Sequence, residues 1–396
     1  MRIVSIIHPA GHEMPMLVDK DGLPIPDANE WLFGRRSQAP TTQSRVLSEL
    51  VPLCRWAEDN AIDVRQRIEG GQGFTEAEII SGLVETLRLN FNSKDAKKRV
   101  SNSVFNLRLA TCNAYLKWMC NECIARLASD DRRVDRIVAI KGLVHDWLTQ
   151  SATAQPVSQN PSAKALTADQ QSALAELLHP KIRGLGGTLA AKYRNFVAIM
   201  LMLLCGLRRG ELLSLRVEDV TFGAIPSIQV RRRSPDPDDK RRPRPRVKRL
   251  PRTLALDPFL AHFINDYVMV HREVLLERSK TDTPYLIVSD EGDPLSISRI
   301  YALCVELRRK LKGVVPDNFS PHSLRHSFSE SMEQALRNAG LDESRRAQAL
   351  ALLRGDTSLD SQNVYIEREI RERANLVLSK YQGSLVSQVE QNQIPF

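Results

Sequence analysis

The sequence predicts a mainly α-helical protein with a small antiparallel β-sheet in its C-terminal domain, an α+β fold. Three observations predict it. Apolar residues recur at helical spacing through residues 39 to 151. A stretch rich in Ser, Ala, Pro and Gln, residues 152 to 164, has no periodicity and is typical of an interdomain linker. Beyond it, the strand-like segments SIQVRRR and VKRLPRTLAL flank a Pro-rich tip and predict a hairpin.

Composition narrows the class of protein. The chain has 396 residues, of which 42% are hydrophobic and 26% charged, as in an ordinary globular protein. No apolar run is long enough to span a bilayer, and the opening apolar patch is too short for a signal peptide. We therefore expect a cytoplasmic protein without a membrane partner. The net charge of +9 suggests an anionic partner.

The cysteines and histidines do not suggest a metal or a cofactor. Six cysteines without framework spacing indicate reduced thiols. Cys120 and Cys123 form a CxxC pair, but no second pair completes a zinc site, so we expect them to pack in a helical core. Most histidines show no metal-like clustering and are expected to be structural. No P-loop or carboxylate cluster is present, so we expect no cofactor.

The N-terminal half divides into two parts. Residues 1 to 38 form an extended segment, in which a strand-like run is broken by Asp-Gly and prolines. Residues 39 to 151 contain four amphipathic helices. One of these begins at Thr75, with Glu78 completing a capping box.

Part of this helical domain is basic. Between residues 97 and 141 lie ten Lys or Arg against four Asp or Glu. A solvated helix face is an equally good explanation of such a run by itself. With a nucleic acid as partner, it becomes a surface that contacts phosphates. The candidate DNA-binding residues here are Lys97, Lys98, Arg99, Arg108 and Lys117.

The C-terminal domain, residues 165 to 380, opens with Thr167 as a helix N-cap. A strongly apolar helix follows and stops at Gly206, which predicts burial on nearly every side. Arg208 comes directly after it. A guanidinium at the mouth of a buried helix needs an anion, because it cannot be neutralised by deprotonation. Glu211 is the alternative partner, in a structural ion pair. Residues 381 to 396 are assigned to a C-terminal tail.

The predicted hairpin is strongly cationic. Residues 231 to 249 hold ten Lys or Arg against three Asp. Such a run is usually solvated surface, but flanking strands and prolines favour an ordered finger that lies along a duplex groove. The candidate DNA-binding residues here are Arg231, Arg232, Arg233, Lys240, Arg241, Arg242, Arg244 and Arg246.

His322 and Arg325 are one helical turn apart, so their side chains share a helix face. A planar guanidinium suits two oxygens of a phosphate. Tyr365 follows about forty residues later and, with its charged neighbours, belongs to an exposed helix rather than to a core. Taken alone, this pattern also fits an ordinary amphipathic helix.

Several ordered motifs together resemble the catalytic domain of the tyrosine recombinases, the lambda-integrase, Cre and Xer family. The family's first arginine motif is matched by Gly206-Leu207-Arg208, with Glu211 three positions on. Its catalytic lysine, in the hairpin, corresponds to Lys248.

The second arginine motif, His-x-Leu-Arg-His, is complete from His322 through Arg325 to His326, and the tyrosine nucleophile corresponds to Tyr365. One position departs from the family pattern. The histidine or tryptophan expected nine residues before the tyrosine is Asp356. An ionised carboxylate cannot donate a hydrogen bond to a phosphate. Either Asp356 turns away to orient Tyr365 or Lys248, or a raised pKa keeps it protonated. The neighbouring Arg354 or Thr357 is the alternative source of the missing donor.

The resemblance implies a helical N-terminal DNA-binding domain, a tyrosine-recombinase catalytic domain, and a site-specific recombinase or integrase of a mobile element. The implied enzyme cuts and rejoins DNA through a covalent 3′-phosphotyrosyl intermediate. It would act as a homo-oligomer, a tetramer on synapsed DNA, with accessory proteins left open. Two alternatives remain: a type IB topoisomerase-like enzyme, and a catalytically impaired DNA-binding regulatory protein. The amphipathic segment after Tyr365 favours the recombinase over the topoisomerase, because in the family such a helix docks on a neighbouring protomer; the alternative is that it folds back on its own domain.

Overall fold

The computed structural model describes residues 1–7, 13–91, 98–128, 130–154, 165–182, 185–234, 236–247, 249–279, 282–356 and 364–391. Of residues 364–369 and 386–391 it describes only the backbone. The chain divides into two compact units, Met1–Asn160 and Pro161–Phe396. Each unit has its own core of buried apolar side chains, so each is described by itself.

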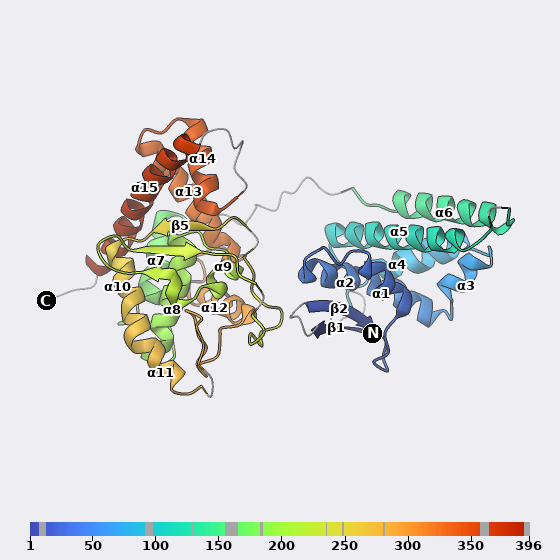
Figure 1. Cartoon of the computed structure of the whole chain (residues 1–396), viewed down its shortest axis with the longest axis horizontal. Helices are drawn as coiled ribbons and strands as arrows, with labels where there is room; N and C mark the ends of the chain where they lie inside the picture. Colours follow the sequence, from blue (N-terminus) through green and yellow to red (C-terminus); the bar gives the residue numbers. More distant parts are fainter. Residues whose placement is uncertain are drawn as a thin grey trace. The chain divides into compact units, whose positions relative to one another are not determined.

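Unit 1 is a helical domain with one β-hairpin (Figure 1). Strands β1 and β2 pair antiparallel, with Ile3 opposite Leu17. The predicted capping box is confirmed, because Thr75 Oγ1 accepts from the Glu78 N–H at 3.2 Å and Glu78 Oε2 from the Thr75 N–H at 2.8 Å. In order, the elements are β1 (Arg2–Ile7), β2 (Glu13–Val18), α1 (Pro26–Phe33), α2 (Pro40–Asp59), α3 (Val64–Glu69), η1 (Glu78–Val84), α4 (Glu85–Arg88), α5 (Asn102–Ala125) and α6 (Arg133–Gln150).

Unit 2 packs its helices around α8 and carries a three-stranded antiparallel sheet in the order β3-β4-β5. Its elements are α7 (Ala168–Leu178), α8 (Leu189–Leu204), α9 (Arg209–Ser214), η2 (Val217–Asp219), β3 (Val220–Thr221), β4 (Ser227–Val230), β5 (Arg252–Ala255), α10 (Pro258–Asp266), η3 (Tyr267–His271), α11 (Arg272–Leu276), α12 (Ile297–Lys310), α13 (Pro321–Asn338), α14 (Glu343–Arg354) and α15 (Val364–Gln391). The predicted mainly helical α+β class is confirmed.

Helix α8 organises unit 2 as its sequence predicts. Nearly all its side chains are buried, because its apolar residues surround the whole helix instead of one stripe. Thr167 is the N-cap of α7, as predicted, and Gln170 completes a capping box there. None of the helices formed by the described residues is long and apolar enough to cross a membrane.

The C-terminal helix α15 packs on its own unit. Ala374, Leu378 and Leu385 are buried, and the Gln382 side chain accepts from the Asp257 N–H at 2.8 Å. The buried stripe of this helix is therefore used within the same chain. Consequently, its amphipathic pattern does not favour exchange between protomers.

Candidate active site

Arg208 and Arg325 converge on one point from segments more than a hundred residues apart. Arg208 directly precedes α9, and Arg325 lies in the first turns of α13. Arg208 Nη1 and Arg325 Nη2 each donate to the carbonyl oxygen of Arg354, both at 3.1 Å. That carbonyl belongs to the last turn of α14, where helix carbonyls lack partners in the helix and carry partial negative charge. The two guanidinium groups, which we call the arginine clamp, therefore lie side by side.

A buried carboxylate holds Arg208 in place. Glu211 is only 1% exposed and accepts from Arg208 Nη1 at 3.2 Å and from the Arg208 N–H at 3.0 Å. It also accepts from Arg252 Nη2 at 2.8 Å. Burial opposes ionisation of Glu211, but Arg252 and the Arg208 N–H lower its pKa below the usual value. The predicted ion-pair partner of Arg208 is thus present. It contacts Nη1 of Arg208 and leaves Nη2 for another acceptor.

The histidines of α13 flank the clamp. The rings of His322 and His326 meet edge to face, with centroids 4.5 Å apart. Burial, followed by the effects of His326, Arg325 and Arg208, lowers the pKa of His322. A neutral imidazole at this position can donate a hydrogen bond from one ring nitrogen and accept a proton on the other. Burial and then the charge of Arg208 also lower the pKa of Arg325.

Asp356 lies against the clamp. Its Oδ1 accepts from Arg208 Nη2 at 2.8 Å and is 3.8 Å from Arg325 Nη2. Arg354 Nε is 3.1 Å from Oδ2, and Arg249 Nε is 3.6 Å from Oδ1. Burial opposes ionisation, but the Arg208 hydrogen bond and the charge of Arg354 hold the pKa of Asp356 below its usual range. This contradicts the alternative in which a raised pKa keeps Asp356 protonated.

A glycine fixes the position of Asp356. Gly355 ends α14 in the left-handed region, with φ of 64°. A Cβ at this position would lie 2.6 Å from Arg252 Nη1 and 2.9 Å from the Leu250 carbonyl oxygen. The Asp356 N–H then donates to the Ala351 carbonyl at 2.9 Å. Glycine is therefore required here both for the turn and for the close approach.

A cavity of about 220 Å³ opens beside Asp356. It lies between β5, the end of α14 and α15, and its lining includes Thr253, Leu352, Arg371 and Asn375. The cavity therefore adjoins Asp356, and one of its walls is α15, the helix whose sequence contains Tyr365.

Two predicted catalytic residues cannot be placed by their side chains. Lys248 lies outside the described residues. Tyr365 lies in α15, for which the structure describes only the backbone at this position. Their roles as catalytic lysine and tyrosine nucleophile, which the resemblance implies, therefore stay predictions.

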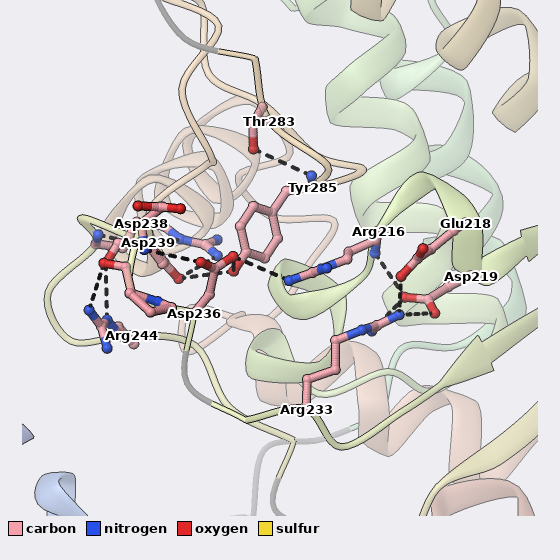
Figure 2. Close-up of polar contacts among 12 residues, drawn as sticks. Arg216, Glu218, Asp219, Arg233, Asp236, Asp238, Asp239, Arg244, Thr283 and Tyr285 are labelled. Carbon is pink, nitrogen blue, oxygen red and sulfur yellow. Dashed lines mark hydrogen bonds and ion pairs between the residues drawn. The ribbon is translucent and has the colours of Figure 1, made fainter. Parts of the chain in front are cut away.

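The cationic segment between β4 and β5 is folded onto unit 2. Figure 2 shows it around Tyr285, whose hydroxyl donates to Asp236 Oδ2 at 3.2 Å, while Arg216 donates to the same oxygen at 3.2 Å. Arg241 is buried and donates to Asp239 Oδ1 at 2.9 Å, as well as to two backbone carbonyls. The strands are shorter than predicted because this segment binds the domain through side chains and carbonyls instead of continuing the sheet.

Internal partners take up part of the predicted DNA-binding charge in this segment. Arg244 is buried and donates to the Asp239 carbonyl oxygen at 3.0 Å. Arg233 donates to Asp219 Oδ2 at 2.9 Å (Figure 2). The predicted residues whose side chains remain exposed are Arg231, Arg232, Lys240 and Arg242, with Arg246 half-buried. Of these, Arg242 also donates to the carbonyl oxygens of Asp239 and Arg241, at 2.8 and 2.7 Å.

The candidate DNA-binding residues of unit 1 also differ in exposure. Lys98, Arg99 and Lys117 are exposed, and Arg99 pairs with Glu85 at 3.0 Å. Arg108 instead donates to two backbone carbonyls at the end of α4, both at 2.7 Å. Lys97 lies outside the described residues.

Within the part of the chain that the structure describes, no group of three or more His, Cys, Asp or Glu could hold a metal ion. Cys120 and Cys123 are buried in the core of unit 1, as their helical spacing predicts. Burial raises the pKa of the Cys120 thiol to about 12, so it remains an unreactive core side chain at neutral pH.

Three contributors to the site were missed in the sequence: Arg252, Arg249 and the carbonyl of Arg354. For Arg252 a signal was present. It lies two residues before Leu254, and residues two apart in a strand share a face, so a charged side chain faces the core there. A buried arginine needs a buried carboxylate, which is Glu211. No sequence pattern indicates that a helix-terminal carbonyl will serve two guanidinium groups.

The comparisons with known proteins agree with the helical fold and the motifs. Residues 164–350 match the model described as the phage integrase family. No curated protein matches this chain.

Three solved structures are among those to which this chain is similar. The XerH site-specific recombinase bound to difH substrate is 14% identical, covering 72% of this chain and 94% of that one with a TM-score of 0.36. The Tn1549 transposon integrase in complex with circular intermediate DNA is 16% identical, and the match covers 68% of this chain and 75% of that one with a TM-score of 0.35. A lambda integrase dimer bound to a COC′ core site is 14% identical, and the match covers 91% of this chain and 97% of that one with a TM-score of 0.35.

Proposed function

We propose, from the premise that residues 164–350 of this chain are a phage integrase family domain, that the protein is a site-specific DNA recombinase of a mobile element. It cuts and rejoins strands through a 3′-phosphotyrosyl intermediate. One observation carries the proposal: Arg208 and Arg325, far apart in the sequence, donate to a single carbonyl oxygen and form one cationic point. Nine residues beyond Asp356 in the sequence comes Tyr365, the tyrosine of the family motif.

The chemistry follows from the charge of the substrate. Attack on a phosphodiester places additional negative charge on its nonbridging oxygens, and fixed cations stabilise that charge. Arg208 and Arg325 are proposed to bind these oxygens. His322, neutral at pH 7 because its pKa is lowered, donates a further hydrogen bond.

Covalent transfer to tyrosine retains the energy of the phosphodiester bond that is broken, because one phosphoester bond replaces another. The Tyr365 hydroxyl gives its proton to water, its oxygen forms a bond to phosphorus, and the bond from phosphorus to the 5′ oxygen breaks. Lys248 is proposed to give the departing 5′ oxygen its proton. A 5′ hydroxyl of a different strand then reverses these steps and releases Tyr365. The balance is complete without an oxidant, a nucleotide or a cofactor.

DNA is the proposed partner of both units. Lys98, Arg99 and Lys117 in unit 1, with Lys240 and Arg242 in unit 2, are exposed cations suited to phosphate contacts. We propose assembly as a homo-oligomer on DNA, a tetramer when two sites are synapsed, and a cytoplasmic location.

A binding-only protein is the second candidate, and one observation favours it. The carboxylate of Asp356 lies 2.8 Å from Arg208 Nη2, where a phosphate would need that donor. A type IB topoisomerase-like enzyme would use the same residues. Because α15 packs on its own unit, its sequence pattern no longer favours a recombinase over that alternative.

Covalent trapping tests the proposal. Nicked duplex fragments cut from the DNA that flanks the gene would be incubated with the protein, so that the short strand released by cleavage diffuses away. The wild type is expected to form a detergent-resistant protein–DNA adduct, and Tyr365→Phe none. Tyr301→Phe makes the same chemical change at an exposed tyrosine of α12 and should leave the adduct unchanged. Binding by the wild type without any adduct would establish the binding-only protein instead.

A further inference from the structure

The carboxylate of Asp356 occupies an anion site built from four guanidinium groups. Its Oδ1 lies 2.8 Å from Arg208 Nη2, 3.8 Å from Arg325 Nη2 and 3.6 Å from Arg249 Nε, and its Oδ2 lies 3.1 Å from Arg354 Nε. A carboxylate and a phosphate present similar pairs of oxygens to arginine. The arrangement is therefore that of a phosphate site with a carboxylate in it.

We propose that Asp356 fills the phosphate site of the free protein and that DNA phosphate must displace it. Arg249 and Arg354, which now hold the carboxylate, then join Arg208 and Arg325 as ligands of the phosphate. This inference rests on the proposed function for the identity of the phosphate, but not for the occupancy of the site.

The clamp keeps its shape without Asp356. Arg208 Nη1 is held by Glu211 Oε1 at 3.2 Å and by the Arg354 carbonyl at 3.1 Å. Arg325 Nη2 donates to the same carbonyl at 3.1 Å. Asp356 takes only the outward edge of Arg208, the edge that the other acceptors leave open. The carboxylate is thus an occupant of the site and not its scaffold.

Asp356 also has room to leave. Its backbone is fixed by Gly355 and by the bond to the Ala351 carbonyl, but its side chain is 25% exposed. The cavity of about 220 Å³ beside it is also lined by Arg371. Rotation of the side chain into this cavity would vacate the four guanidinium groups without moving α14. Phosphate and carboxylate repel each other at such distances, so entry of one favours departure of the other.

Sulfate provides a probe that does not depend on DNA cleavage. Melting temperature would be measured against sulfate concentration at constant ionic strength, balanced with chloride. Asp356→Asn is expected to bind sulfate about tenfold more tightly than the wild type, because a negative charge is removed from within contact distance of the anion. Asp356→Ser, which also removes the charge, should behave alike. Adding Arg249→Gln to Asp356→Asn should remove most of the gain.

Asp238→Asn is the matched control, since it removes an exposed carboxylate from another basic part of unit 2 (Figure 2). It should leave sulfate affinity unchanged. Equal affinity in wild type, Asp356→Asn and Asp356→Ser would overturn the inference, as would an equal gain in Asp238→Asn. With the nicked duplexes, Asp356→Asn should also speed adduct formation several-fold. Absence of adduct in every protein would count against the proposed function, while the sulfate result would still decide the inference.

Discussion

At the scale of single residues, Glu211 is the side chain on which the arginine clamp depends. It is 1% exposed and lies between Arg208 and Arg252. Glu211→Gln would leave two guanidinium groups facing each other without a compensating charge. We expect the free energy of unfolding to fall by about 3 kcal/mol, as when one partner of a buried ion pair is removed. Denaturant titration of unit 2 measures this.

Glu218→Gln is the control for that measurement, because Glu218 pairs with Arg233 at 2.9 Å but is 62% exposed. Its loss should change the free energy of unfolding by less than about 1 kcal/mol. Equal effects of the two substitutions would contradict the role assigned to Glu211.

The pH dependence of stability follows from the same carboxylate. The pKa of Glu211 is lower in the folded protein than its usual 4.5, so the unfolded chain binds the proton more tightly. The stabilisation is complete above 4.5 and is lost as pH falls through the lower, folded pKa. The wild type should therefore lose stability in acid more steeply than Glu211→Gln. If the free energy of unfolding fell equally steeply in acid for both proteins, a group other than Glu211 would control the loss of stability at low pH.

At the scale of elements, the segment between β4 and β5 contains neighbouring cations with opposite expected roles. Lys240 is exposed, whereas Arg241 is buried against Asp239. Lys240→Gln should leave stability within about 0.5 kcal/mol of the wild type. It should also lower the slope of log affinity for duplex DNA against log salt by about 0.9, the contribution of one phosphate contact.

Arg241→Gln should instead reduce the free energy of unfolding by about 3 kcal/mol, because Asp239 would remain buried without its partner. Salt titrations of binding to one fixed duplex, with unfolding curves of both variants, separate the two effects. An unchanged salt slope in Lys240→Gln would remove that residue from the DNA-binding surface.

The sequence predicts the helices, the order of the motifs and the positions of the charged residues. It does not predict which residues those charged side chains contact. The apolar run of α8 predicts a fully buried helix without knowledge of its neighbours. The arginines of residues 231 to 249 look alike in sequence. Whether one meets solvent or Asp239 depends on how the segment folds onto Tyr285, which contacts Asp239 across 46 residues of sequence. Likewise, Asp356 is visible as a departure from the family pattern, but its place in the clamp depends on the turn at Gly355.

At the scale of the whole molecule, the two units have separate cores. Fragments 1–154 and 165–396 are each expected to unfold cooperatively when produced alone. The second fragment keeps the clamp but loses the exposed cations Lys98, Arg99 and Lys117, so its affinity for DNA should fall and its salt slope should become shallower. Thermal unfolding followed by circular dichroism, and binding to the same duplex, check this. A second fragment that does not fold would show that unit 1 is needed for its core.

The proposed strand exchange requires that Tyr365 becomes bonded to DNA at the arginine clamp. The most direct measurement is to digest the trapped protein–DNA adduct with protease and nuclease and to identify the modified peptide by mass spectrometry. The account predicts a nucleotide 3′-phosphate on the peptide that contains Tyr365, and its loss in Arg208→Gln and Arg325→Gln. A nucleotide on any other residue, or an adduct that persists in Tyr365→Phe, would contradict it.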